Sequence, residues 1–246
     1  RNTDLLFTAV MKMGPLQLIL QKNDEIDEDT LTVLRNGIQR ILSGEPLQYV
    51  TGETEFMSLP FLVNPNVLIP RSDTETLVEY IIDNAIDNPD ILEIGTGSGC
   101  IAVSLASYIK KSRVTAMDIS SAALETAKKN AELNSVSVNF IKHDIMTDFD
   151  GRFDIIVSNP PYIETSVIPT LDKNVRDFEP HIALDGGSDG LDFYRRIVKT
   201  APQHLNSGGM LCFEVGHTQA NEVSRLMKEC FETEIIKDLC KVNRVV

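Results

Sequence analysis

Residues 93–99 read Glu93-Ile94-Gly95-Thr96-Gly97-Ser98-Gly99, a glycine-rich loop between an apolar run and the start of a helical pattern. Three glycines let the backbone turn tightly and allow a ligand to approach the main chain beside a helix N-terminus. The Gly-x-Gly-x-Gly spacing differs from the Gly-x-Gly-x-x-Gly of dinucleotide sites, and the loop lacks the Lys of a phosphate loop. The loop therefore favours a nucleoside ligand over a nucleotide triphosphate, although glycine turns also occur for packing reasons.

Apolar runs alternate with helical patterns on both sides of this loop. The runs lack the in-out alternation of half-exposed strands, which is typical of a parallel sheet covered by helices on both faces. The sequence thus predicts a doubly wound α/β fold. Strands are expected at residues 91–94, 114–117, 138–141, 155–157 and 210–215, and helices at 101–109, 122–134, 193–205 and 219–230. The pattern leaves the direction of the tail segments, 234–239 and 244–246, open.

The region before the α/β pattern has a different organisation. Residues 4–43 have the spacing of two amphipathic helices around a polar loop at 21–29, and residues 45–63 look like a linker and a short hairpin. Ser72 and Glu75 have the spacing of a capping box, which predicts a helix to about residue 88. We expect a helical domain at 1–45, a linker with a hairpin at 46–66 and the α/β domain at 67–246. Because the chain begins with Arg1, we also expect a leading segment to be missing.

Composition sets broad limits on function. The net charge of -13 argues against wide electrostatic binding to nucleic acid, which requires Lys and Arg to neutralise phosphates. The four cysteines are scattered and no histidines have metal-ligand spacing, so we expect reduced thiols in a cytoplasmic protein and no metal site. No signal peptide or membrane-length apolar run is visible in the sequence.

Acidic residues follow two further predicted strands. Asp118 stands about 20 residues after the glycine loop, where a carboxylate can accept hydrogen bonds from both ribose hydroxyls. Ser120 can cap the following helix and leave Asp118 for the ligand. Asp144 can accept from the exocyclic amine of an adenine while Ile145 packs on the ring, although a turn residue is an equally good interpretation of Asp144.

The fourth strand end carries Asn159-Pro160-Pro161-Tyr162. Each proline fixes its own φ and restricts the residue before it, so this turn is stiff. It presents one amide side chain, free carbonyls and an aromatic ring, which suits the grip of a planar NH2 group. A nucleoside site beside such a grip indicates S-adenosylmethionine and methyl transfer, a reaction in which the enzyme mainly aligns the reactants and excludes water.

Several motifs resemble those of the PrmC/HemK family, the peptide chain release factor N5-glutamine methyltransferases. The resemblance runs from Asp4 essentially to Val246. Besides the glycine loop it includes Gly44-Glu45-Pro46-Leu47-Gln48-Tyr49 with Thr51-Gly52, Val67-Leu68-Ile69-Pro70-Arg71 with Thr74-Glu75, Ser158 to Ile163, Phe178-Glu179-Pro180, Gly186-Gly187, Asp189-Gly190-Leu191-Asp192 and Gly208-Gly209.

The resemblance implies a class I methyltransferase domain with seven strands, the last antiparallel, and an N-terminal helical domain that helps to dock the release factor. The glutamine of the Gly-Gly-Gln motif would be the methyl acceptor and S-adenosylhomocysteine the product. Asn159 and the Pro160 carbonyl would accept hydrogen bonds from the glutamine NH2, beside Pro161 and against the ring of Tyr162. The cofactor would contact Glu93, Gly95, Thr96, Gly97, Ser98, Gly99, Asp118, Ile119, Asp144, Ile145 and Asn159.

Two departures from the family pattern stand out. Ser72-Asp73 replaces the common Pro-Glu, and aliphatic Ile145 stands where some members have an aromatic residue. The N-terminal domain also looks shorter than is usual in the family. We expect a monomer without direct nucleic-acid or membrane binding. For Arg71 a structural ion pair is favoured over a substrate contact, and Glu214 has no assigned role.

Three other functions compete with this interpretation. A glutamine methyltransferase of a ribosomal protein would share the whole site. An adenine or cytosine amino-methyltransferase would share the turn and the cofactor, but it should also carry a basic face. A non-enzymatic binding module would have no need for the turn and the glycine loop together.

Overall fold

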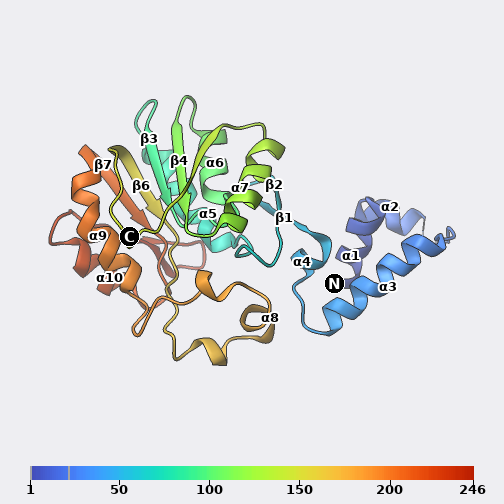
Figure 1. Ribbon diagram of the computed structural model, residues 1–246. Helices are drawn as coiled ribbons and strands as arrows, with labels where there is room; N and C mark the ends of the chain where they lie inside the picture. Colours follow the sequence, from blue (N-terminus) through green and yellow to red (C-terminus); the bar gives the residue numbers. More distant parts are fainter. Residues whose placement is uncertain (1, 22) are drawn as a thin grey trace.

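The computed structural model describes residues 2–21 and 23–246, which form an α/β domain and a small helical lobe (Figure 1). Five parallel strands pair in the order β5-β4-β3-β6-β7. Because the order reverses between β3 and β6, a crevice for ligands is expected at the carboxyl ends of these strands. The strands are β3 (Asp90–Ile94), β4 (Arg113–Asp118), β5 (Val138–Lys142), β6 (Phe153–Ser158) and β7 (Leu205–Phe213). All five predicted strands are confirmed, and β7 begins five residues before its predicted start at 210.

Helices cover both faces of this sheet, as the continuous apolar strands predicted. Neighbouring residues of β3 point to opposite cores: Ile91 packs with α5 and α6, and Leu92 packs with α9 and α10. Both side chains are fully buried. The helices are α5 (Ser72–Asn84), α6 (Cys100–Tyr108), α7 (Ser121–Leu133), α9 (Asp192–His204) and α10 (Ala220–Met227).

The tail segments extend the sheet in an antiparallel direction. β8 (Ile236–Lys237) and β9 (Asn243–Val245) pair with each other, and β9 lies beside the end of β7. Phe213 and Val246 exchange hydrogen bonds of 2.8 and 3.0 Å in both directions. The sheet therefore consists of five regular parallel strands plus this attached antiparallel pair.

The N-terminal lobe differs from the predicted pair of helices. It contains α1 (Asn2–Met11), α2 (Pro15–Leu20) and α3 (Glu28–Leu42). α1 ends at Met11, two residues before the apolar pattern over 5–13 does. Gly14 and Pro15 then begin a separate helix, α2. The blue helices lie to one side of the sheet domain in Figure 1.

The predicted linker contains a short helix, α4 (Leu47–Thr51), before the hairpin of β1 (Glu53–Phe56) and β2 (Leu59–Leu62). Five residues are too few for a stable isolated helix, so tertiary contacts must hold α4. Tyr49 supplies one of them, because its ring is buried and its hydroxyl donates to the Val67 carbonyl at 2.6 Å. The hairpin was correctly predicted.

The capping box predicted at Ser72 and Glu75 was wrong. Arg71 precedes α5, and no side chain caps this helix end. Glu75 instead accepts a hydrogen bond of 2.7 Å from the backbone N–H of Met57, so a tertiary contact with the hairpin replaces the local one. α5 also ends at Asn84, four residues before the expected end.

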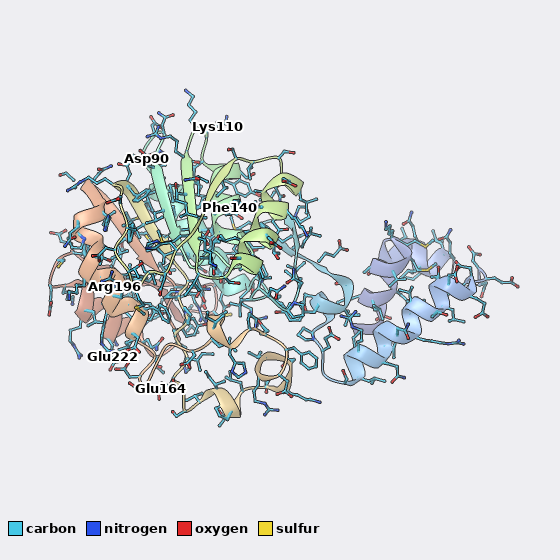
Figure 2. The ribbon with its side chains drawn as sticks, in the orientation of Figure 1. Asp90, Lys110, Phe140, Glu164, Arg196 and Glu222 are labelled. Atoms are coloured by element: carbon cyan, nitrogen blue, oxygen red, sulfur yellow. The ribbon has the colours of Figure 1, made fainter. Side chains whose placement is uncertain are left out.

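The two ends of the sheet face different surroundings. In Figure 2, Asp90 at the start of β3 and Lys110 lie at one end of the parallel strands, whereas Glu164, which follows β6, lies at the opposite end. The long segment 163–185, with η1 (Ile168–Thr170), α8 (Lys173–Arg176) and η2 (His181–Ala183), spreads over this second edge. Lys173 Nζ donates to the Ser43 carbonyl at 2.7 Å and so joins the segment to the end of the helical lobe.

No helix among residues 2–21 and 23–246 combines the length and the apolar character that a membrane crossing demands.

Candidate active site

A cavity of about 320 Å³ opens at the carboxyl ends of β3, β4 and β6. Its walls come from six stretches that are distant in sequence but meet at this edge of the sheet. They are residues 93–98 of the glycine loop and residues 117–120, 143–146 and 158–161, with parts of 66–71 and 180–183. Thr74 of α5, Ala123 of α7, and Phe193 and Ile197 of α9 add to the lining. All predicted cofactor residues except Gly99 line this cavity, as do Asn159, Pro160 and Pro161.

The glycine loop leaves open space where side chains would otherwise stand. Gly95 and Gly97 have φ values of +76° and +55°, a region that L side chains rarely adopt. A Cβ at either position would meet no other group within 4 Å. The loop is held by the Met117 carbonyl, which accepts from the N–H groups of Gly95 and Thr96 at 2.9 and 3.0 Å. Its open side is therefore a fixed surface onto which a ligand can pack.

Glu93 lies below this loop with 1% of its surface exposed. Its carboxylate accepts hydrogen bonds from Thr96 Oγ1 at 2.5 Å and from the Ala102 N–H at 3.1 Å. Burial nevertheless raises the pKa of Glu93 to about 8, because desolvation of the charged form outweighs both bonds.

This raised pKa predicts how the stability depends on pH. Below its ordinary pKa, Glu93 is neutral in both states and its stabilising effect is fully present. This effect is lost as pH rises through about 8. We expect Glu93→Gln, which cannot ionise, to reduce the decline in melting temperature between about pH 5 and about pH 8. Differential scanning fluorimetry across this range measures the effect.

The matched control for this prediction is Glu79→Gln, the same substitution at an exposed residue of α5. It should leave the slope of melting temperature against pH unchanged. Parallel curves for wild type and Glu93→Gln would contradict the predicted burial effect.

Asp118 organises the loop from the end of β4. Its Oδ2 accepts from the Gly97 N–H and its Oδ1 from the Ser120 N–H, each at 2.8 Å. Desolvation raises the pKa of Asp118, and these two backbone donors oppose the shift. Ser120 caps α7 as predicted, with Oγ accepting from the Ala123 N–H at 3.2 Å. Each carboxylate oxygen of Asp118 thus accepts one backbone N–H and keeps a further lone pair for a ligand, so the predicted ribose contact stays a prediction.

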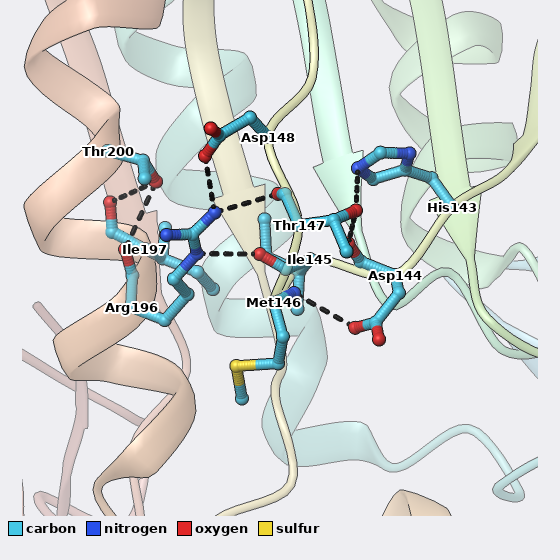
Figure 3. A network of polar contacts seen from close by, with 9 residues as sticks. All are labelled: His143, Asp144, Ile145, Met146, Thr147, Asp148, Arg196, Ile197 and Thr200. Carbon is cyan, nitrogen blue, oxygen red and sulfur yellow. Dashed lines mark hydrogen bonds and ion pairs between the residues drawn. The ribbon is translucent and has the colours of Figure 1, made fainter.

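Asp144 begins a turn that borders the cavity (Figure 3). Its Oδ1 accepts from the Met146 N–H at 2.9 Å, as a turn residue does, while Ile145 is buried. Arg196 of α9 holds the turn from the other side. It donates to the Ile145 and Thr147 carbonyls, each at 2.8 Å, and to Asp148 Oδ1 at 3.0 Å.

The sequence predicts the adenine of S-adenosylmethionine at this turn, and on that prediction removal of the Arg196 support weakens binding of the cofactor. We expect Arg196→Met to raise the Kd for S-adenosylhomocysteine by roughly three- to tenfold, since the turn loses hydrogen bonds worth about 1 kcal/mol each. Isothermal titration calorimetry measures the change. Arg195→Met is the matched control, because the neighbouring Arg195 forms exposed ion pairs with Asp189 and Asp192. Equal Kd values for the two variants would contradict the assigned support.

The Asn159-Pro160-Pro161-Tyr162 turn enters the cavity directly from β6. Within residues 2–21 and 23–246, neither Asn159 Oδ1 nor the Pro160 carbonyl accepts a hydrogen bond. Asn159 Nδ2 donates to Thr74 Oγ1 at 3.3 Å, so the amide nitrogen faces α5. Gly186 packs tightly beneath the turn: a Cβ there would lie 2.7 Å from the Tyr162 Cα, so a larger residue would displace it.

Tyr162 stands at the end of this turn. It does not line the cavity, and its ring packs partly buried against the core with α9 and α10. Burial raises the pKa of its phenol to about 12, which keeps it neutral. Gln219 Nε2 donates to the Tyr162 carbonyl at 2.9 Å and so fixes this end of the turn.

Comparison with known proteins identifies the family of this chain. A Methyltransferase small domain model matches residues 72–173, and a PrmC N-terminal domain model matches residues 1–52. The release factor glutamine methyltransferase of Geobacter sulfurreducens is 40% identical over 100% of this chain and 87% of its own length. That of Flavobacterium psychrophilum is 39% identical over 98% and 88%. The chain belongs to the release factor glutamine methyltransferase family.

Solved structures agree on the fold of this family member. A methyltransferase from Pyrococcus furiosus superposes with a TM-score of 0.58 at 22% identity, over 85% of this chain and 95% of the other. The chain therefore has the α/β fold of S-adenosylmethionine-dependent methyltransferases. In the part of the chain that the structure describes, no cluster of three or more His, Cys, Asp or Glu is arranged to hold a metal ion.

Residues around this methyltransferase site hold its walls in place through long-range contacts. The sequence suggested such a role for Arg71 and did not reveal the roles of Glu179 and Asn130. Arg71 forms an ion pair with Glu179, whose side chain is 1% exposed, so the favoured structural interpretation of Arg71 is confirmed. Glu179 also accepts from the Ile69 N–H at 3.3 Å and thus joins two walls of the cavity. Asn130 of α7 donates to the Ser98 carbonyl at 2.8 Å behind the glycine loop. Local sequence patterns carry no signal for such long-range partners, although Arg71 and Glu179 both lie in motifs that resemble the family.

Proposed function

We propose that this chain transfers the methyl group of S-adenosylmethionine to the side-chain amide nitrogen of the glutamine in the Gly-Gly-Gln motif of peptide chain release factors. Family membership supports the substrate. One observation supports the chemistry: Asn159 and Pro160 line the same cavity as the glycine loop and Asp118, and within residues 2–21 and 23–246 neither Asn159 Oδ1 nor the Pro160 carbonyl accepts a hydrogen bond. S-adenosylhomocysteine would be the product, and the reaction would not need a metal ion.

The residues of the cavity fit the cofactor. We assign its methionine part to the open surface of Gly95 and Gly97, its ribose to Asp118 with Ile119, and its adenine to Asp144 with Ile145. S-adenosylmethionine supplies an activated methyl group on a sulfonium centre. The cavity holds donor and acceptor close together and limits the access of water.

The main chemical difficulty lies in the acceptor. A carboxamide nitrogen is a poor nucleophile because its lone pair is delocalised into the carbonyl. Asn159 Oδ1 and the Pro160 carbonyl, by accepting both N–H bonds, orient the nitrogen and favour the positive charge that develops there. The proton can leave after transfer, so a dedicated base is not required. Tyr162, at the end of the same turn, would pack against the plane of the amide.

We extend the proposal to the whole chain. Residues 1–45 would help to dock the release factor, residues 46–66 would connect the lobes, and residues 67–246 would perform the transfer. The exposed apolar side chains of α2, Leu16, Ile19 and Leu20, accord with a docking role for the first segment. We propose that the protein acts as a monomer in the cytoplasm, where release factors work.

A methyl-transfer assay with radiolabelled S-adenosylmethionine tests the function. Purified release factor, its Gln→Ala variant at the Gly-Gly-Gln motif, ribosomal proteins and duplex DNA are offered in parallel. We expect label on the wild-type release factor alone. Label retained by the Gln→Ala variant would reject the assigned site, and label on ribosomal protein or DNA would support one of the competing substrates.

A further inference from the structure

Glu214 is a buried acid immediately behind the Asn159 turn, and the proposed mechanism does not use it. It follows β7, and 2% of its surface is exposed. Its N–H donates to the Ser158 carbonyl at 3.0 Å, and its carbonyl accepts from the Tyr194 hydroxyl at 2.8 Å. The backbone of Glu214 is therefore fixed beside the residue that precedes Asn159, although Glu214 itself does not line the cavity.

Thr74 joins this acid to Asn159. Thr74 Oγ1 donates to Glu214 Oε2 at 2.5 Å and accepts from Asn159 Nδ2 at 3.3 Å. An ionised carboxylate can only accept, so the Thr74 proton must point toward Glu214 and the Thr74 oxygen must face an N–H. Hydrogen bonds arranged in such a chain strengthen one another.

We propose that Glu214 and Thr74 are positioning residues that select the orientation of the Asn159 amide. With the amide nitrogen held toward Thr74, Oδ1 faces away from it and is available to a substrate NH2 group. The inference rests on the proposed function, because it explains why the site presents an acceptor. It also accounts for the choice of an amide over a carboxylate substrate, since two oxygen acceptors repel a carboxylate.

Protonation of Glu214 should reverse the direction of the hydrogen bonds that run from Asn159 through Thr74 to Glu214. A neutral carboxyl can donate to Thr74, whose proton can then turn toward Asn159 and favour a flipped amide with its NH2 group in the cavity. That NH2 group would oppose the NH2 group of the substrate. The substrate glutamine does not titrate near neutral pH. Because Glu93 in the same cavity also has a raised pKa, the part of the acid-side loss that Glu214→Gln removes is the part that reports on Glu214.

The groups around Glu214 set its protonation near neutral pH. The pKa of Glu214 is raised to about 7, mainly by burial and to a smaller extent by Asp73. Thr74, Arg244 and Asn159 oppose the shift by stabilising the charged form. The other titratable groups in its field are Cys100, Tyr162 and Tyr194, whose raised pKa values keep them neutral in this range.

The test measures kcat at saturating release factor and S-adenosylmethionine from about pH 6 to about pH 9. In the wild type we expect kcat to fall roughly tenfold between about pH 8 and about pH 6. Glu214→Gln, which is nearly isosteric and cannot ionise, should lose this acid limb. Thr74→Val should lower kcat by about tenfold across the range, with the Kd for S-adenosylhomocysteine within about twofold of wild type. Thr74→Ser, which keeps the hydroxyl, should restore most of the lost turnover.

Thr200→Val is the matched control, because the Thr200 hydroxyl is also buried but donates within its own helix, α9. Melting temperatures monitor folding, and the pH profile of Glu214→Gln decides the question even where Thr74→Val lowers the folded yield. An unchanged acid limb in Glu214→Gln would overturn the inference while leaving the proposed function intact. A wild type that does not methylate release factor would overturn both.

Discussion

Replacement of Asn159 by alanine is expected to lower kcat at least tenfold at saturating cofactor. The variant removes one of the two acceptors that orient the substrate nitrogen, and tenfold corresponds to about 1.4 kcal/mol of transition-state stabilisation. We expect a loss larger than tenfold, because the Pro160 carbonyl alone does not keep the nitrogen in line with the methyl group. Initial rates of label transfer to purified release factor measure the effect.

Two controls make this result specific. Asn139→Ala, the same change at an exposed position of β5, should leave kcat unchanged. The melting temperature of Asn159→Ala should stay close to that of wild type, since the hydrogen bond from its amide to Thr74 is long, at 3.3 Å. Turnover near the wild-type value would reject Asn159 as the substrate acceptor.

Asp118→Ala should raise the Kd for S-adenosylhomocysteine by at least tenfold. The variant removes the carboxylate assigned to the ribose, and it also leaves the N–H groups of Gly97 and Ser120 without their acceptor. Hydrogen bonds to a charged group contribute about 1.5–3 kcal/mol each, so the loss of one such bond is enough for the expected change. Isothermal titration calorimetry with the folded variant measures the Kd.

Asp154→Ala is the appropriate comparison for this variant. Asp154 also accepts a backbone N–H, from Asp90 at 2.9 Å, but at the opposite end of the sheet. It should therefore affect stability and leave cofactor binding unaltered. If Asp118→Ala binds S-adenosylhomocysteine as tightly as Asp154→Ala does, then Asp118 neither orders the loop nor holds the ribose.

Most of the fold could be predicted because its signals are local. Continuous apolar runs identified the five parallel strands, and the glycine loop and the Asn159 turn both follow strands as expected. Predictions of secondary structure failed where a contact with a residue distant in sequence replaces the local interaction that the pattern suggested. Glu75 bonds to Met57 rather than capping its own helix, and Tyr49 stabilises a helix in a segment that looked like a linker.

In the candidate site, too, the features that depend on local sequence could be predicted and those that depend on distant residues could not. The amino-acid sequence by itself determined the strand-end residues, the stiffness of the Asn159 turn and the motifs of the family, since each depends on residues close together in the chain. The tertiary structure alone decided that Tyr162 packs outside the cavity, that Asp118 already accepts two backbone N–H groups, and that Thr74 and Glu214 hold Asn159. Thr74 and Glu214 are 140 residues apart, and no periodicity links them. Their hydrogen bond exists because the parallel sheet brings the end of β7 beside the end of β6, while α5 packs across both.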